Sequence, residues 1–508
     1  MSEDGHGPGN DSMRTLIRGG WVVGNEAGSH VLFRDGVVVF EDDTILHVGT
    51  RFEGRVDRTL DARGRLVAPG FIDTHVHCGH LAALRLIGDV GRPDYFGQPF
   101  FEFTTPRRGT RAVGDPRYVS SDETSHEILR VWTEFTIVEL LRNGITTFVE
   151  FGARAHVQQA LAQALGRLGI RGYLGAGYNV GRWVGGENGR LERVVDEAGG
   201  AALFDEAIAF AKDIDGRYGG RARGLLCPTG VEMCSTTQLL ETARLAAELR
   251  MPVAIHAAYS VLEFMGIVRE TRMTPIEFLQ SLGLLDLGPL LNIGHGNLVA
   301  EHRRMPYSGG RDIELMGAHR CSVSHCPVNI SRRGRFLDTW GRYRKAGVNL
   351  CLGSDTYPRD MMMQMRTASY FGKVLGADLS SAPAAEVFEA ATLSGARSLG
   401  RDDLGRLCAG AKADIIVIDL SGRDTLRYGP VRDPIKSLVD VGIADDVETV
   451  IVDGVVRMAD RRIPGVDIDR VRSDAQLAGE HMWRHWADWD PLFRTADEMS
   501  PMSFRVVD

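Results

Sequence analysis

The chain has 508 residues, 44% of them hydrophobic, which allows one large core and a smaller second domain. Its formal net charge of −8 gives no basic field, so we expect a small-molecule substrate and no nucleic-acid partner. We see no signal-peptide pattern, no run of about 18 apolar residues and no paired spacing among the seven cysteines. These observations predict a cytoplasmic protein with reduced thiols and no membrane association.

The two ends of the chain have a different texture from the middle. Residues 1–12 are rich in Gly, Ser and acids, and we predict that they are disordered. Residues 13–68 and 403–465 contain short apolar alternations, with hairpin signals at Asp35-Gly36 and Asp453-Gly454. Because these two β segments bracket the middle of the chain, we expect them to form the two parts of one small β-sandwich.

The middle of the chain, residues 69–402, alternates short apolar runs with helical patterns such as residues 204–218 and 237–249. We interpret the apolar runs as about eight buried parallel strands: residues 68–77, 144–149, 170–174, 222–227, 252–256, 290–295, 320–325 and 348–355. Buried strands that alternate with helices over roughly 300 residues predict an α/β fold, a (β/α)8 TIM barrel. In such a barrel the functional groups lie at the carboxyl ends of the strands.

The first of these runs ends in His75-Val76-His77. Side chains alternate across a strand, so His75 and His77 project from the same face, as two ligands of one metal ion would. The pair alone could be a chance pattern. However, four more polar residues stand at or just past the ends of later runs: His256, His295, His325 and Asp355. Their common placement favours a metal site at the barrel mouth.

In combination, several motifs resemble the amidohydrolase superfamily, in its mononuclear branch of cytosine deaminase, guanine deaminase and triazine chlorohydrolases. The motifs are Ala68-Pro-Gly-Phe-Ile-Asp-Thr-His-Val-His77, His256, Gly294-His295, Ser324-His-Cys-Pro-Val328 and Gly353-Ser-Asp355. The resemblance covers nearly the whole chain. It implies that one divalent metal ion, Zn²⁺ or Fe²⁺, is bound by His75, His77, His256 and Asp355, and that the protein is a homo-oligomer.

The chemistry of these residues agrees with that assignment. Three neutral imidazoles and a carboxylate suit Zn²⁺ or Fe²⁺ and leave a position for water. In the implied mechanism Asp355 accepts the proton of this water and passes it to the leaving nitrogen, while His295 polarises the attacked group. A second metal is not expected. Binuclear relatives use a carboxylated lysine at the fourth strand, but this strand ends Leu225-Leu-Cys-Pro228, where Cys227 is either a ligand or a buried thiol.

One departure from the family pattern affects the expected reaction. Deaminases of this branch carry His-x-x-Glu at the fifth strand, whereas this chain has Tyr259 at the Glu position. A phenol is a poor proton shuttle for a ring amidine, but it can donate to an oxyanion. The phenylurea and molinate hydrolases also lack this Glu, and the chain is similar to them. We therefore expect hydrolysis of an acyclic urea, carbamate, thiocarbamate or amide, with Tyr259 as a catalytic residue.

Two alternatives stay open. The first is a hydrolytic deaminase or chlorohydrolase of a purine, pyrimidine or triazine, in which another acid, for example Glu263, replaces the missing Glu. The second is a catalytically inactive scaffold, which the intact ligand set argues against.

Three residues are candidate substrate contacts. Phe101 lies in an aromatic loop, residues 92–109, which either covers an apolar or aromatic substrate or packs on the barrel. His325 and Glu150 stand at strand ends, where a structural hydrogen bond or an arginine partner would explain them equally well. The tail, residues 466–508, carries Trp483, Trp486 and Trp489. We expect it to dock on the barrel or on a neighbouring subunit.

Overall fold

A computed structural model describes residues 13–78, 85–86, 105–110, 123–186, 190–421 and 426–507. Two predictions lie outside these described residues: the disorder of residues 1–12, and the contact of Phe101 with substrate together with most of its aromatic loop.

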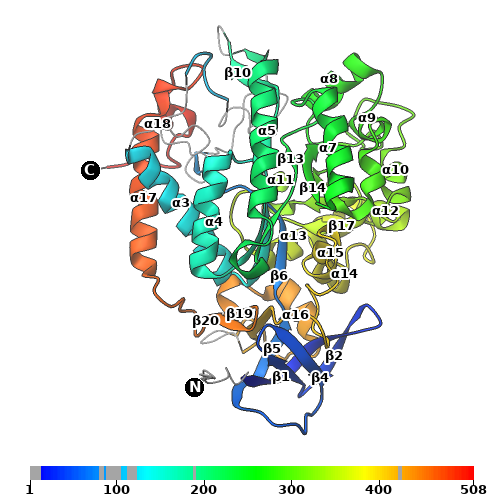
Figure 1. The fold of residues 1–508 in the computed structure, drawn as a ribbon, viewed down its shortest axis with the longest axis vertical. Coiled ribbons are helices and arrows are strands. Elements are labelled where there is room, and N and C mark those ends of the chain that lie inside the picture. The colour runs from blue at the N-terminus through cyan, green and yellow to red at the C-terminus, as the bar shows by residue number, and fades with distance from the viewer. Residues whose placement is uncertain are drawn as a thin grey trace, which may run out of the picture.

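The two flanks of the chain pair into one eight-stranded sheet, seen at the bottom of Figure 1. Its strands are β1 (Arg14–Glu26), β2 (Ser29–Arg34), β3 (Val37–Glu41), β4 (Thr44–Gly49), β5 (Arg58–Pro69), β18 (Ile415–Asp419), β19 (Val447–Val452) and β20 (Val455–Met458). The flanks meet where β18 runs antiparallel to β5, with Val417 opposite Val67. Both hairpin signals are turns with positive φ at Asp35 and Asp453. The pairing of the flanks is therefore observed, while their description as a sandwich stays a prediction.

The middle of the chain is α/β, and its strands form two four-stranded parallel sheets. One contains β6 (Phe71–Val76), β7 (Ile145–Glu150), β8 (Arg171–Leu174) and β12 (Ala222–Gly224); the other contains β14 (Val253–Ala257), β15 (Leu291–His295), β16 (Ser322–His325) and β17 (Asn349–Leu352). Isolated parallel bridges, Leu226 with Val253 and Val76 with Asp355, connect the two sheets at both edges. The predicted fourth strand is divided into β12 and a short β13 (Cys227–Pro228), which pairs with β9 (Gly177–Tyr178).

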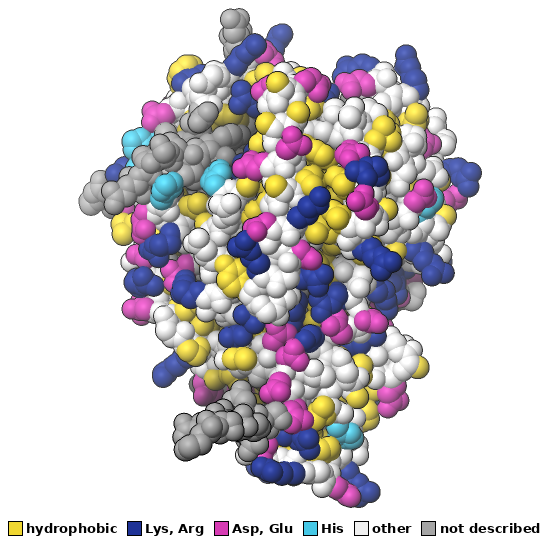
Figure 2. All heavy atoms as spheres, in the orientation of Figure 1, with side chains coloured by type: hydrophobic (Ala, Val, Ile, Leu, Met, Phe, Trp, Pro, Cys, Tyr) yellow, Lys and Arg dark blue, Asp and Glu magenta, His cyan; other side chains and the backbone are white. Residues whose placement is uncertain are grey.

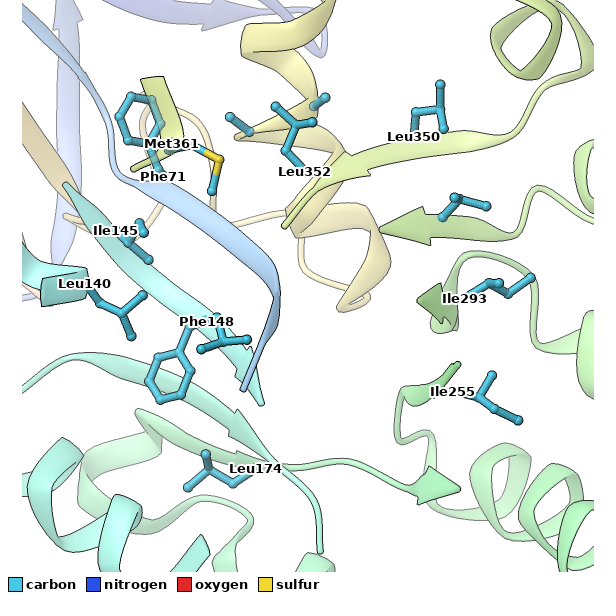
Figure 3. Close-up of a cluster of buried hydrophobic side chains, with 14 of the residues drawn as sticks. Phe71, Leu140, Ile145, Phe148, Leu174, Ile255, Ile293, Leu350, Leu352 and Met361 are labelled. Atoms are coloured by element: carbon cyan, nitrogen blue, oxygen red, sulfur yellow. The ribbon is translucent and has the colours of Figure 1, made fainter. Parts of the chain in front are cut away.

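Helices separate successive strands, including α3 (Glu123–Arg142), α4 (Ala155–Leu168), α5 (Glu197–Ile214), α7 (Thr236–Leu249), α8 (Val261–Thr271), α11 (Pro327–Arg332), α12 (Trp340–Ala346) and α13 (Met361–Gly376). Figure 3 shows the buried side chains that the strands contribute to the core, among them Phe71, Phe148, Ile255 and Leu350. Because both faces of these parallel strands are covered, their sequences are largely apolar. Buried polar residues such as Asp73, Thr147 and Asn292 interrupt them within the strands.

The aromatic tail packs on its own chain. Helix α17 (Ile468–Arg484) lies beside α3, at the left of Figure 1. Trp486 and Trp489 are fully buried, with ring centroids 4.2 Å apart, in a cluster that includes Trp132 of α3. On the face shown in Figure 2, basic and acidic side chains are interspersed. Within the described ranges, no helix combines the length and the apolar character needed to cross a bilayer.

Candidate metal centre

The end of β6 and the end of β17 hold the first three candidate ligands. The backbone N–H of Asp355 donates to the His75 carbonyl at 2.7 Å, and the N–H of His77 donates to the Asp355 carbonyl at 2.7 Å. Two glycines leave room for the His75 side chain. A Cβ on Gly353 would lie 2.6 Å from His75 Cβ, and one on Gly294 would lie 2.8 Å from His75 Cε1. These backbone contacts fix His75, His77 and Asp355 relative to one another.

The imidazole nitrogens of three histidines converge on one point. His77 Nε2 lies 3.2 Å from His75 Nε2 and 3.3 Å from His256 Nε2. Asp355 Oδ1 lies 3.6 Å from His77 Nε2 and 3.9 Å from His75 Nε2. Two Zn–N bonds of 2.0–2.1 Å at a tetrahedral angle place their nitrogens about 3.3 Å apart. The donor atoms therefore have the spacing that ligands of a single small divalent ion require.

The charge states of the histidines also suit a metal ion. Burial lowers the pKa of His75 well below 6.5 and that of His256 to about 4, so both rings are neutral near pH 7. His256 Nδ1 donates to the Thr229 carbonyl at 2.6 Å, because a carbonyl can only accept. This contact leaves the Nε2 lone pair of His256 directed at the centre, as metal-ligating histidines commonly are.

Asp355 and His295 form the other side of the centre. Asn329, on α11, donates from Nδ2 to Asp355 Oδ2, and its own Oδ1 accepts from Thr356 at 3.2 Å. His295 Nε2 lies 3.7 Å from Asp355 Oδ2. Burial raises the pKa of Asp355 to about 6, which the positive charges of Arg333 and Arg335 oppose. His295, the last residue of β15, is thus placed beside the candidate ligands.

Two buried residues that the sequence analysis did not single out support this arrangement. Asp73 accepts from the Ser354 N–H at 2.9 Å and its hydroxyl at 2.5 Å, and from the His75 N–H at 3.2 Å. Arg359 donates to the His77 carbonyl at 2.7 Å and to Glu139 at 2.6 Å. The signal for Asp73 was its position two residues before His75, on the same face of β6.

Tyr259 lies at the edge of the centre, with its ring centroid 6.0 Å from that of His256 and 6.3 Å from that of His295. Its hydroxyl donates to Glu232, a buried residue that the sequence analysis missed. Glu263 does not take the place of the missing Glu. Its two oxygens accept from the N–H groups of Ala258 at 2.7 Å and Tyr259 at 2.8 Å. Its Oε2 also accepts from the Ser260 N–H at 3.2 Å, in the capping box that begins α8.

The predicted substrate contacts His325 and Glu150 have other neighbours. The His325 ring lies 6.2 Å from that of Trp340 and lines a small pocket with Arg335, Phe336 and Phe371. Glu150 accepts from the Gln158 amide and from the Ala153 N–H at 3.3 Å, and burial raises its pKa to about 7. Their roles toward a substrate stay predictions.

Comparisons with known proteins extend over nearly the whole chain. The model of the "Amidohydrolase family" matches residues 66–457. A 5-methylthioadenosine/S-adenosylhomocysteine deaminase of Natronomonas pharaonis is 32% identical over 473 residues, which cover 91% of this chain and 97% of the relative. The enzyme of the same name from Thermococcus onnurineus is 28% identical over 455 residues, covering 89% and 95% of the two chains.

Solved structures show the same fold at lower identity. An adenosine deaminase from Xanthomonas campestris with bound zinc has a TM-score of 0.76 at 22% identity, covering 92% of this chain and 98% of that one. The atrazine chlorohydrolase from Arthrobacter aurescens complexed with zinc has a TM-score of 0.73 at 22% identity, covering 92% and 100%. At this identity these structures show the shared fold, and the comparisons give no support to the similarity to phenylurea hydrolases.

The converging histidines, the aspartate and the family match agree with one another. The chain belongs to the amidohydrolase family and is a metal-dependent hydrolase that acts on carbon–nitrogen bonds other than peptide bonds.

Proposed function

We propose that the protein is a hydrolytic deaminase that replaces an amino group on a purine-type ring by oxygen. The observation that carries this proposal is the 32% identity to a 5-methylthioadenosine/S-adenosylhomocysteine deaminase over 97% of that relative's length. The family model, which matches residues 66–457, spans every strand end that contributes to the metal centre. The identity to this relative supports the alternative of the sequence analysis over the acyclic substrates expected from Tyr259.

We further infer that the resident ion is a single Zn²⁺ held by His75, His77, His256 and Asp355. The support is the spacing of the donor atoms and the zinc present in similar structures. A bound zinc ion would lower the pKa of its water from 15.7 to about 7, which makes a nucleophile available at neutral pH. The two bridges that connect the parallel sheets support the inference that the eight strands close into a (β/α)8 barrel around this site.

The chain's own groups then move the protons. The Asp355 carboxylate accepts a proton from the attacking water and delivers it to the departing amino nitrogen. Its contact with Asn329 keeps Oδ2 in place during both transfers. His295 Nε2, 3.7 Å from that oxygen, is placed to donate to the oxygen that adds to the ring carbon.

The test is a product assay on zinc-reconstituted protein with two substrate panels. The first contains 5-methylthioadenosine, S-adenosylhomocysteine, adenosine, guanine and amino- or chlorotriazines, and the product measured is ammonia or chloride. The second contains N-aryl ureas, carbamates and anilides, and the product measured is the aryl amine. We expect ammonia from a purine-type member of the first panel.

A second function keeps one specific observation in its favour. Tyr259 stands where a deaminase of this branch has Glu, and a hydroxyl donor suits attack on an acyclic carbonyl. Aryl amine release from the second panel without ammonia from the first would establish this function in place of the proposed one. If neither panel gives a product although the protein holds its full complement of zinc, the alternative of a catalytically inactive scaffold would be favoured instead.

A further inference from the structure

Ring deamination needs a proton on the ring nitrogen beside the attacked carbon, so the site needs an acid within reach of that nitrogen. Most buried carboxyl groups around the centre are already occupied by donors. The Asp73 carboxylate accepts a hydrogen bond from Ser354, and that of Glu150 accepts one from Gln158. The Glu263 carboxylate caps α8. Among the described residues this leaves Glu232, whose Oε1 accepts from the Tyr259 hydroxyl.

The position of Glu232 is fixed by the loop between β13 and α7. The Val231 N–H donates to the His256 carbonyl at 3.2 Å, and the Thr229 N–H donates to the Tyr178 carbonyl at 3.1 Å. Gly230 gives the carboxyl group room, since a Cβ there would lie 3.0 Å from Glu232 Oε2. The same loop therefore orients His256 through Thr229 and contacts Tyr259 through Glu232.

The second carboxyl oxygen of Glu232 is nearly unsupported. Oε2 is buried, and no partner in the described ranges makes a hydrogen bond of standard geometry to it. Burial raises the pKa of Glu232, while the hydroxyl of Tyr259, the indole of Trp183 and the charge of Arg193 oppose that rise. The neighbouring carboxyl of Glu263 adds repulsion between the two acids, since the charge of Glu232 raises the pKa of Glu263. Burial thus shifts the ionisation of Glu232 toward its neutral form.

The protonation state of Glu232 decides what Tyr259 can do. An ionised Glu232 accepts the phenolic proton, so Tyr259 can only accept a hydrogen bond from a substrate. A protonated Glu232 donates to the phenolic oxygen, and the Tyr259 hydroxyl is then free to donate into the site. Only the second arrangement offers a proton to a bare ring nitrogen.

We infer that Glu232 supplies, through the Tyr259 hydroxyl, the proton that a heteroaromatic substrate requires at its ring nitrogen, an inference that rests on the proposed deaminase function. The Tyr259 O–H bond breaks as the ring N–H bond forms, and the Glu232 proton passes to the phenolic oxygen. Tyr259 contacts the substrate, and Glu232 is a positioning residue that acts through it.

The remaining protons balance. Water contributes its oxygen to the ring carbon, and one of its protons travels through Asp355 to the amino group, which leaves as ammonia with the electron pair of its C–N bond. The second water proton is released when the new hydroxyl becomes a carbonyl. A proton from solvent then restores the neutral form of Glu232.

The test compares Glu232→Gln, Tyr259→Phe and the double variant as full-length, zinc-loaded proteins. Tyr428→Phe is the matched control, because the Tyr428 hydroxyl also donates to a buried carboxylate, Asp446 Oδ2 at 2.7 Å, far along the chain from the site residues. Each single variant should lower kcat for ammonia release by about 100-fold or more. KM should stay within about threefold, since the lost proton acts in the transition state. The double variant should be no slower than the slower single variant, because the two residues act as one unit.

Infrared difference spectra give a measurement that does not depend on activity. At pH 7, the carbonyl stretch of a protonated carboxylic acid should be present in the wild type and missing from Glu232→Gln. Tyr259→Phe should shift this band, even if Glu232→Gln does not fold. Absence of the band, or a Glu232→Gln protein that keeps more than about a third of the wild-type rate, would overturn the inference. If the wild type releases no ammonia from any substrate, the proposed function fails, whereas the infrared result still reports on Glu232.

Discussion

The Nδ1 atom of His256 lies 2.6 Å from the carbonyl oxygen of Thr229, and this contact connects a candidate metal ligand to the loop that carries Glu232. A backbone carbonyl is a permanent acceptor, so the tautomer of His256 is fixed with its Nε2 lone pair toward the centre. The orientation of the ligand and the placement of the Tyr259–Glu232 pair therefore depend on the same loop, residues 229–235. A change in the path of this loop would affect metal binding and proton transfer together.

The histidine cluster predicts a clear dependence on metal. Removal of the ion with a chelator should abolish hydrolysis, and Zn²⁺ should restore it. His75→Asn should lose most of the bound metal, since it removes the nitrogen that lies among the other donors. Metal content per chain, measured by plasma mass spectrometry, checks this expectation. His319→Asn is the control, because His319 pairs with Asp286 at the end of a distant helix. Equal metal in both variants would contradict the assigned site.

Asn329 should matter although it is not a candidate ligand. Its amide donates to Asp355 Oδ2, and loss of such a contact to a ligand commonly lowers metal affinity or activity by about 10- to 100-fold. We expect Asn329→Ala to weaken zinc binding within this range in a competition titration with a chromophoric chelator. A wild-type dissociation constant in Asn329→Ala would show that Asp355 does not need this donor.

Gly353 should not tolerate a methyl group. A Cβ there would meet His75 Cβ at 2.6 Å and the His75 backbone nitrogen at 3.0 Å, so the strand ends must separate. Overpacking of this kind costs about 1–3 kcal/mol, and we expect Gly353→Ala to lower both the unfolding midpoint and the zinc content. Gly266→Ala is the matched control, since Gly266 lies within α8 with no atom within 4 Å of an added Cβ. Alanine is the better helix former, so this variant should be slightly more stable than the wild type.

Alternation and strand-end placement predicted most of the candidate metal centre from the sequence. His75 and His77 share a face because side chains alternate along β6, and His256, His295 and Asp355 follow apolar runs that are short enough to be buried strands. The pairing of the two flanks was also predicted, because both contain the same pattern of short apolar alternations. These features depend on local periodicity, which a sequence displays directly.

The residues that the sequence did not reveal depend on the paths of loops. Glu232 is 27 positions before Tyr259, and their contact requires the fourth predicted strand to be divided and β13 to lead into the loop beside β14. Glu263 was considered as an acid for the reaction, but its position at the third residue of α8 makes it a cap. The capping box Ser260-x-x-Glu263 was a signal for this role that could have been used.

Arg171 should be essential to the attachment of the flanking sheet. It is buried on β8, and its guanidinium pairs with Asp414 at 3.1 Å and with Asp453 in the turn between β19 and β20. Arg171→Met would leave the buried Asp414 carboxylate without its cation, which costs about 3–5 kcal/mol, and would leave Asp453 with Arg221 alone. Denaturant unfolding should show this loss, whereas Arg244→Met, which breaks ion pairs on the exposed face of α7, should leave the midpoint unchanged. Equal midpoints for the two variants would refute a structural role for Arg171.

Asp312 predicts a pH dependence of stability that is separate from the metal centre. Its carboxyl accepts from the Thr274 hydroxyl at 2.5 Å and the Ala300 N–H at 2.8 Å, and burial raises its pKa from 3.8 to about 7. Between these two values the folded protein holds a proton that the unfolded chain has lost, so the free energy of unfolding falls as pH rises through this window. Asp312→Asn cannot ionise and should lack this contribution. From pH 5 to pH 8, the Tm of the wild type should therefore fall relative to the Tm of Asp312→Asn. The other titrating groups contribute equally to both proteins and cancel in this comparison. Parallel Tm curves for the two proteins would mean that the pKa of Asp312 is the same in the folded and unfolded chains.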